Sequence, residues 1–211
     1  MTPDVEFDHR RTDRLVIRRF GPGDASSFAA YRSDPAVARY QSWATPFAES
    51  QARDFIDGLG ATHPDTPGHW FQFAVAEAAT GVHVGDVAAG VDADDSRLVE
   101  VGITLARSAQ GQGYGAEALA GLLDYLFLER SKHRVTAECD TRNAPSSMLL
   151  ERLGIRREAH HLRSAWYKGE WTDEYVYAVL AEEWLERPSP PGSTHTVGGQ
   201  SRATLRTQNG R

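Results

Sequence analysis

The chain has 211 residues, of which 40% are hydrophobic and 25% are charged, and its formal net charge is −6. This size and composition are typical of one globular domain. The acidic balance provides no basic patch for nucleic acid, and no window reaches the roughly 20 consecutive apolar residues that a membrane span requires. The single cysteine, Cys139, excludes an internal disulfide and a thiolate cluster for metal. We expect a cytoplasmic monomer or homodimer with no nucleic acid, membrane or metal partner.

The two ends of the chain differ from the part between them. Residues 1–10 are charged without periodicity and predict a flexible lead-in, so we place the domain at residues 11–186. Residues 187–211 are rich in Pro, Gly, Ser and Thr, with no apolar periodicity and no acidic residue. Such a segment cannot bury enough apolar surface to become ordered, so it predicts a disordered tail.

The first third of the domain predicts one strand and two helices. Alternating apolar residues in RLVIRRF, residues 14–20, predict the strand. Asp24 is a candidate N-cap for a helix that must end before the next proline. Thr45 and Pro46 are suited to an N-cap and a first helical residue, and they predict a second helix that ends near Gly60.

In the middle of the chain, apolar residues recur at every second position, which is the period of a strand. Residues 70–88 alternate apolar and polar side chains around a turn at Thr80 and Gly81, which predicts a hairpin. Residues 98–106 (LVEVGITLA) predict a further strand. After a glycine-rich loop and a helix, residues 134–141 (RVTAECDT) predict the strand that completes a right-handed β-α-β crossover.

The glycine-rich loop is the most informative stretch. Gly111, Gly113 and Gly115 directly precede an apolar run at helical spacing. Glycines allow the backbone to approach a ligand, and the N–H groups at a helix start attract anions, so the loop predicts a site for a phosphate-bearing molecule. Two alternatives remain at this point: a structural turn without a ligand, and a dinucleotide fingerprint G-x-G-x-x-A that ends at Ala116. The fingerprint lies late in the chain and several residues after the strand, which counts against it.

The remaining elements are a short helix and a hairpin. Asn143 and Ser146 open the helix and Gly154 ends it. Residues 162–180 then alternate around a turn at Lys168 and Gly169, which predicts a closing hairpin.

Several segments together resemble one known family. Gln110, Gly113 and Gly115 match the Q/R-x-x-G-x-G/A acyl-CoA loop of the GNAT superfamily of N-acetyltransferases. Five further segments resemble its RimJ/RimL-like subgroup in the same order: RTDRLVIRRF, VHVGDVAAG, VEVGITL, NAPSSMLLERLGI and YKGEWTDEYVYAVLAEEW. The resemblance covers about residues 11–185.

The resemblance implies an α/β fold with a mixed, mostly antiparallel sheet that is splayed at its middle and flanked by helices on both faces. It also implies acetyl-CoA as co-substrate, with its pantetheine arm along the splayed strand and its pyrophosphate in the glycine loop. The implied cofactor-binding residues are Ile103, Thr104, Leu105, Gln110, Gly111, Gln112, Gly113, Tyr114, Gly115, Ala116, Asn143 and Ser146.

The catalytic residues follow from the chemistry of acetyl transfer. The attacking amine must lose a proton, and the departing thiolate can gain one. By resemblance Ser146 would be the acid, with a capped helix start as the alternative explanation. Glu100 and Asp173 are candidate bases, although carboxylates at such positions are usually solvated. Candidate substrate-binding residues, which core packing could equally explain, are Trp43, Trp70, Asp86 and Trp166.

We therefore expect an acetyl-CoA-dependent N-acetyltransferase that acts by direct transfer in a ternary complex. The acceptor is either a protein N-terminal amine or a small-molecule amine such as an aminoglycoside or a polyamine. One alternative is a non-catalytic acyl-CoA-binding module, and a remote one is a nicotinamide-dependent oxidoreductase.

Overall fold

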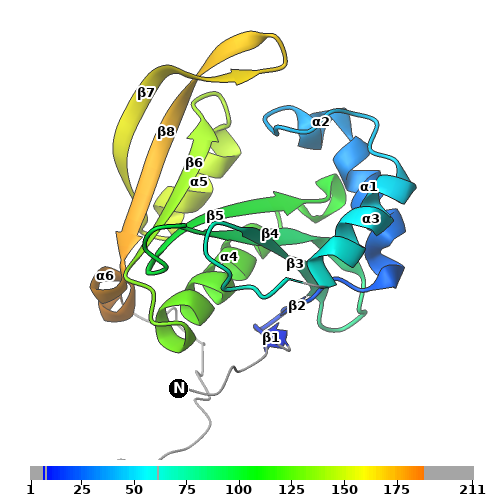
Figure 1. Ribbon diagram of the computed structural model, residues 1–211, viewed down its shortest axis with the longest axis horizontal. Coiled ribbons are helices and arrows are strands. Elements are labelled where there is room, and N and C mark those ends of the chain that lie inside the picture. Colours follow the sequence, from blue (N-terminus) through cyan, green and yellow to red (C-terminus); the bar gives the residue numbers. More distant parts are fainter. Residues whose placement is uncertain (1–6, 8, 61, 188–211) are drawn as a thin grey trace, which may run out of the picture.

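The computed structural model describes residues 7, 9–60 and 62–187, in which eight strands form one sheet with helices around it (Figure 1). The strand order is β1-β2-β3-β4-β5-β6-β8-β7. Every neighbouring pair is antiparallel except β5 with β6, which is parallel. The expected mixed, mostly antiparallel α/β sheet flanked by helices is therefore confirmed.

The elements follow the periodicities of the sequence. The strands are β1 His9–Arg11, β2 Leu15–Arg18, β3 Trp70–Glu77, β4 His83–Val91, β5 Leu98–Leu105, β6 Arg134–Asp140, β7 Arg156–Tyr167 and β8 Glu170–Leu180. The helices are α1 Ala25–Ser33, α2 Pro35–Ala38, α3 Glu49–Gly60, α4 Tyr114–Asp124, α5 Ala144–Arg152 and α6 Ala181–Glu186. Short 3-10 turns lie at Pro22–Asp24 and Arg107–Ala109, and a π-helical turn, Tyr125–Glu129, continues α4. None of the described helices combines the length and hydrophobicity needed to cross a membrane.

Strands β5 and β6 separate at the middle of the sheet, as expected. They pair only at Leu98 with Arg134, Val99 with Val135 and Glu100 with Thr136. Beyond these pairs β5 stays bonded to β4 as far as Leu105, while β6 stays bonded to β8 along its whole length. Each strand is thus held by its outer neighbour, and the two diverge (Figure 1).

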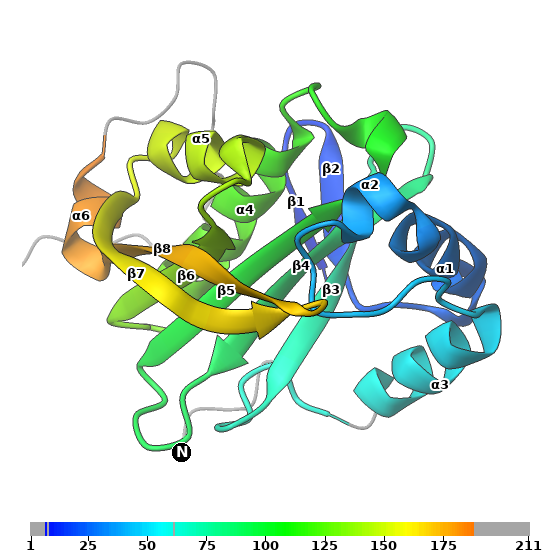
Figure 2. The same cartoon turned by 90° about the horizontal axis from the view of Figure 1, so that it is seen from above.

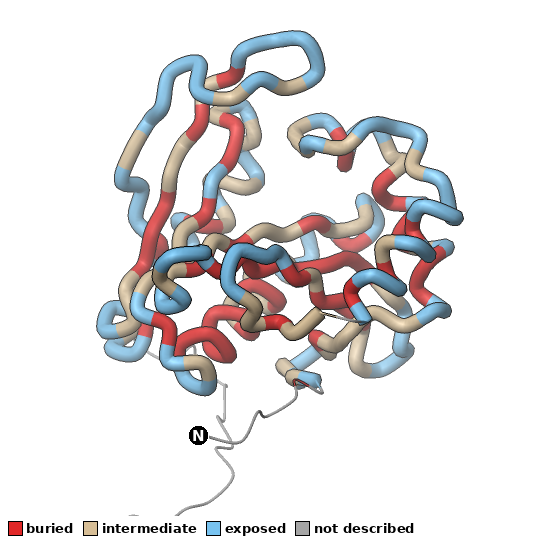
Figure 3. The backbone as a smooth tube through the Cα atoms, viewed as in Figure 1, coloured by how far each residue is buried: buried red, intermediate tan, exposed pale blue. Residues whose placement is uncertain are grey.

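The main core lies between the sheet and α4. Leu119, Leu122 and Leu123 of α4 are almost fully buried in one cluster with Val75 and Val87 of the sheet. Figure 3 shows this burial along the central strands and α4, in contrast to strand β7 and the tip of the β7–β8 hairpin, which are mostly exposed. A smaller core around Phe28 joins α1, α2 and α3, which lie at the other end of the molecule from α6 (Figure 2).

The domain boundaries differ slightly from those expected. His9–Arg11 form strand β1, and Phe7 is buried with its ring 4.6 Å from that of Phe73. The described structure therefore includes residues before residue 11, and the Phe7 side chain packs on β3. At the other end, Arg187 forms an ion pair with Asp124, and residues 188–211 of the expected tail lie outside the described residues.

The second helix begins later than the prediction from Thr45 and Pro46. Helix α3 starts at Glu49. The Ser33 hydroxyl donates to the Phe47 carbonyl oxygen at 3.1 Å and accepts from the Phe47 N–H at 2.9 Å. These two hydrogen bonds hold the segment before α3 against the end of α1. Because the N–H and the carbonyl oxygen of Phe47 are bonded to Ser33, they take no part in helical hydrogen bonds.

A close approach between β4 and β5 gives a test of the fold. A Cβ atom on Gly85 would lie 2.3 Å from the carbonyl oxygen of Thr104 and 2.8 Å from Cα of Leu105. Because backbone cannot move aside cheaply, we expect Gly85→Ala to lower the free energy of unfolding by about 1–3 kcal/mol in a urea titration.

The matched control is Gly58→Ala on α3, where an added Cβ would meet nothing within 4 Å. Alanine is the better helix former, so this variant should be up to about 1 kcal/mol more stable than the parent. Equal stability of the two variants would contradict the close approach of β4 to β5.

Candidate active site

A cavity of about 450 Å³ lies where β5 and β6 separate. Its lining comes from both faces of the sheet, so the cavity passes between the two strands. On the side of α4 and α5 it is lined by Val101, Ile103, Leu119, Ala137, Asn143 and Ser146. On the opposite side it is lined by Arg32, Trp43, Trp70, Asp86, Glu100 and Glu174, among others.

A second cavity of about 340 Å³ adjoins the first near the start of β5. Trp70 and Glu100 line both cavities. The Trp70 ring lies across Gly90, where an added Cβ would be 2.6 Å from the indole. Glycine at this position therefore allows the indole to lie flat on the sheet between the two cavities.

The side of the first cavity opposite α4 is acidic. Burial, with the charges of Glu138 and Glu174, raises the pKa of Glu100 to about 7. Burial and the charge of Glu174 also raise the pKa of Glu138. Asp86 is fully buried, which raises its pKa to about 6 although the Arg32 guanidinium opposes the shift. The pKa values of Glu100 and Asp86 therefore lie near neutral pH, where a general base is most effective.

Arg32 is the one buried cation on this wall of the cavity within the described part of the chain. It comes from α1, and its guanidinium lies 4.1 Å from the ring centroid of Trp43 and 4.3 Å from that of Phe28. Its Nη2 donates to Gln72 Oε1 at 3.1 Å and lies 3.9 Å from Asp86 Oδ1. Helix α1 therefore covers the face of the sheet opposite α4 and closes one end of the cavity.

Eight of the eighteen expected site residues meet in this cavity. Trp43, Trp70, Asp86 and Glu100 line one side, and Ile103, Thr104, Asn143 and Ser146 are also part of the lining. The expected residues Leu105 and Gln110–Ala116 do not line the cavity. In the sequence they come after Thr104, which does line it.

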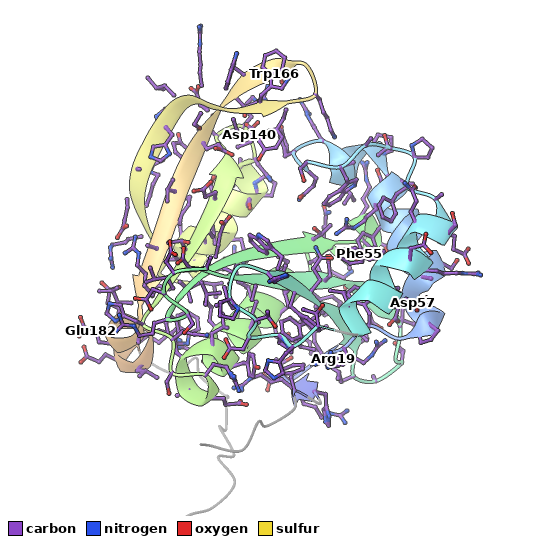
Figure 4. The ribbon with its side chains drawn as sticks, in the orientation of Figure 1. Arg19, Phe55, Asp57, Asp140, Trp166 and Glu182 are labelled. Atoms are coloured by element: carbon purple, nitrogen blue, oxygen red, sulfur yellow. The ribbon has the colours of Figure 1, made fainter. Side chains whose placement is uncertain are left out.

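Trp166 and Asp173 lie outside the cavity. Neighbouring strand residues point to opposite faces, and the cavity is lined instead by Tyr167 and Glu174. The Trp166 ring packs against Trp171 near the tip of the hairpin, beyond Asp140 (Figure 4). Asp173 accepts a hydrogen bond from the Arg163 N–H at 2.8 Å, so its position fits a structural role.

Sequence reasoning missed several lining residues, namely Arg32, Tyr40, Gln72, Tyr167 and Glu174. Gln72 could have been found from strand alternation, because it lies two residues from Trp70 and on the same face of β3. Glu174 lies next to the expected Asp173 and points to the opposite face, so alternation from Asp173 does not lead to it. Arg32 and Tyr40 lie in or near helices, and only the packing of α1 and α2 on the sheet brings them there.

The glycine loop leads from β5 to the start of α4. Gly113 is the N-cap of α4 with φ of 81°, and Gly111 has φ of 74°. The first intrahelical bond runs from the Glu117 N–H to the Gly113 carbonyl, so the N–H groups before Glu117 point out of the helix end. An added Cβ on Gly111 would meet nothing within 4 Å, which leaves room for a ligand against the backbone.

Arg14 holds this loop from the start of β2. Its Nη1 donates to the Gln112 carbonyl at 2.9 Å, and its Nε donates to Glu117 at 2.7 Å. The guanidinium also lies 4.7 Å from the ring centroid of Tyr114. A side chain nearly one hundred residues away in sequence thus fixes the loop to the first turn of α4.

The start of α5 combines a helix cap with part of the cavity wall. Asn143 is the N-cap, and its side-chain oxygen accepts from the Ser146 N–H at 3.4 Å. The capped helix start is therefore present, and both residues also face the cavity. Cys139 is buried with Sγ 3.6 Å from Ser147 Oγ, and burial raises the pKa of its thiol, which disfavours a nucleophilic thiolate.

Comparisons with known proteins identify the family. A sequence model of the Acetyltransferase (GNAT) domain matches residues 14–156. YnaD, an uncharacterized N-acetyltransferase of Bacillus subtilis (strain 168), is 30% identical over 176 residues, which are 83% of this chain and 99% of the relative. The crystal structure of a GNAT-family acetyltransferase from Bacillus anthracis has a TM-score of 0.74 at 30% identity and covers 83% of this chain and 99% of its own. Mycobacterium smegmatis RimJ in complex with CoA-disulfide has a TM-score of 0.71 at 25% identity and covers 80% of this chain and 83% of its own.

The chain therefore belongs to the GNAT family of N-acetyltransferases, and its expected likeness to the RimJ/RimL-like subgroup is confirmed. Its class of activity is acyl transfer, and enzymes of this fold use acetyl-CoA.

The raised pKa of Glu100 predicts a pH-dependent stability. Its ordinary value is 4.5 and its folded value about 7, so between these pH values the folded chain holds a proton that the unfolded chain has lost. The free energy of unfolding should therefore fall as the pH rises through this window. Glu100→Gln stays neutral, and we expect it to be more stable than the parent at about pH 8 by about 1 kcal/mol after solvent screening. Urea titrations at about pH 5 and about pH 8 measure the difference.

The control is Asp57→Asn, the same chemical change on the exposed side of α3 (Figure 4). It should leave the pH dependence of the parent in place. If Glu100→Gln showed the same fall in stability with pH as the parent, the raised pKa would be excluded.

Proposed function

We propose that the chain transfers the acetyl group of acetyl-CoA directly to a primary amine while both substrates are bound. The observation that carries this proposal is the cavity that passes between β5 and β6. A donor and an acceptor can approach it from opposite faces of the sheet and meet within it. Direct transfer needs such a meeting point, and the one thiol of the described cavity wall, Cys139, is buried with a raised pKa, which disfavours it as a covalent carrier.

The side of α4 and α5 fits the donor. Where β5 leaves β6, its ladder N–H and C=O groups lose their strand partners on that edge, and a peptide-like pantetheine arm can satisfy those of Ile103 and the N–H of Leu105. The Leu105 carbonyl oxygen accepts from Gln110 Nε2 at 3.0 Å. The glycine loop after β5 provides room and outward N–H groups for the pyrophosphate. The chain's own contribution is to bind and orient the thioester, which supplies the activated acetyl group.

Residues on both sides of the cavity would serve as the base, the hydrogen-bond donor to the acetyl oxygen, and the acid of the reaction. Glu100 lies at the last paired position before the strands separate, and its raised pKa suits a base that takes a proton from the amine. A backbone N–H of Ile103 or Thr104 would donate to the acetyl oxygen as negative charge develops. Ser146 lines the opposite wall and would return a proton to the departing sulfur.

The acceptor is a protein N-terminal amine or a small-molecule amine. A non-catalytic acyl-CoA-binding module would bind coenzyme A without releasing its thiol in the presence of amines. The match of residues 14–156 to an acetyltransferase domain gives the nicotinamide-dependent oxidoreductase no support.

Thermal unfolding with added ligand, followed by a thiol-release assay, tests the donor site. Acetyl-CoA at 100 times its dissociation constant should add about 2.7 kcal/mol of stability. Gly113→Val should abolish this gain, because Gly113 has φ of 81° and its N-cap position requires close backbone approach.

The matched control is Gly81→Val, which imposes the same left-handed strain at φ of 73° in the β3–β4 turn. It should lose stability but keep its response to acetyl-CoA. Stabilisation by NADH and not by acetyl-CoA would overturn the proposed donor.

Ser146→Ala tests the proposed acid. Thiol release should slow about 10- to 100-fold in kcat, because general acid catalysis typically contributes 10²–10⁴-fold and water can replace part of it. The affinity for coenzyme A should stay close to that of the parent. Ser147→Ala on the same helix turn is the control, and equal rates for the two variants would show that the thiolate leaves without help from Ser146.

A further inference from the structure

The acceptor side of the cavity contains more negative charge than its own cations neutralise. Asp140 is paired with Arg142. Within the described residues, neither Glu100 nor Glu138 has a hydrogen-bond or ion-pair partner, and Glu174 accepts from the Ser164 hydroxyl at 2.9 Å. His161 is the facing group whose charge lowers the pKa of Glu138.

Three of these carboxylates come from neighbouring strands and share one face of the sheet. Glu100 pairs with Thr136, two residues before Glu138 on β6, and Glu174 pairs with Asp140, two residues after it. Diagonal neighbours of this kind are about 7–8 Å apart. Among the described residues no group of three His, Cys, Asp or Glu side chains is placed to hold a metal ion, so this spacing suits a larger organic cation.

Asp86 gives a second and independent indication of a cationic ligand. It is only 2% exposed and lines the same cavity, and its Oδ1 has no partner within hydrogen-bond distance, although the Tyr31 hydroxyl is near enough to lower the pKa of the carboxyl group. The Arg32 guanidinium, at 3.9 Å, is beyond hydrogen-bond reach. A buried oxygen of this kind costs stability unless a ligand donor reaches it. Asp86 is four residues along β4 from Gly90, the partner of Glu100, which places it about 13 Å from Glu100 along the strand direction.

The surface between these two acidic points suits an aliphatic chain. Its floor consists of the small residues Ala88, Gly90 and Gly102, and an added Cβ on Gly102 would meet nothing within 4 Å. Trp43 and Trp70 stand beside the floor, where they can pack on methylene groups and interact with ammonium ions.

On the basis of the acetyl transfer proposed above, we propose that the acceptor is a linear aliphatic polyamine whose second ammonium group is held by Glu138 and Glu174. The ammonium nitrogen gives one proton to Glu100 and, as a neutral amine, bonds to the acetyl carbon. The carbon–sulfur bond then breaks, and Ser146 passes its proton to the sulfur and regains one from the acylated nitrogen, which leaves as a neutral amide. A protein N-terminus with one ammonium group would leave Glu138 and Glu174 without a counter-ion.

Rates of thiol release from acetyl-CoA with four acceptors test this proposal on the unmodified protein. The acceptors are butylamine, 1,4-diaminobutane, a linear triamine and a peptide with a free alanine N-terminus. We expect kcat/KM for the diamine and the triamine to exceed that for butylamine at least about 10-fold, which corresponds to one charge-assisted contact of about 1.4 kcal/mol. Equal values for all amines, or preference for the peptide, would overturn the polyamine assignment and leave acetyl transfer intact. Coenzyme A binding without thiol release from any acceptor would instead overturn the proposed function.

Variants then locate the second ammonium group. Glu138→Gln and Glu174→Gln should each reduce the ratio of diamine to butylamine kcat/KM toward one, mainly through a higher KM for the diamine. The matched control is Glu158→Gln on β7, whose carboxylate pairs with Arg134 and Arg156 outside the first cavity. It should keep the parent ratio. An unchanged ratio in folded Glu138→Gln and Glu174→Gln would show that these residues do not recognise the acceptor.

Discussion

The site depends on the point at which β5 and β6 stop pairing. Three pairs hold the two strands together, and the next residues have bonded partners only on their outer sides. Because those outer ladders continue, the opening is a rigid feature of the sheet and needs no mobile loop. The same separation leaves backbone groups unpaired on the inner edges and creates the cavity between the faces. Donor binding and access for the acceptor therefore have one structural origin.

The charges around this opening work against folding. Glu100, Glu138 and Asp86 are held where burial raises the pKa of each, so ionising them at neutral pH costs stability. Arg32 offsets only the charge of Asp86, at 3.9 Å, and other nearby cations are used elsewhere, since Arg142 pairs with Asp140 and Arg134 with Glu158. An arrangement that is unfavourable in the empty protein is consistent with recognition of a cationic ligand that neutralises it.

Much of the fold could be predicted from the sequence, because periodicity and turn residues are local signals. The strands, the crossover around the glycine loop and the capped helix at Asn143 follow from them. What could not be predicted depends on contacts between distant segments. The hydrogen bonds between Ser33 and Phe47 explain why α3 starts later than predicted. The ring of Phe7 packs against that of Phe73, a residue far away in the sequence. In the site, a shift of one residue separates Glu174, which faces the cavity, from the expected Asp173.

The donor half and the acceptor half of the site differ in how well each can be predicted from the sequence. The proposed donor half relies on backbone geometry, which requires glycines such as Gly113 and a supporting contact from Arg14, so it leaves a recognisable motif. The acceptor half consists of side chains from α1, β4, β5, β6 and β8 that meet only after folding. Among the described residues, none of these side chains stands at a left-handed backbone position that favours one residue type, as Gly113 does. Acceptor choice can therefore change among proteins that keep the same loop, and it must be read from the charges and shape of the cavity.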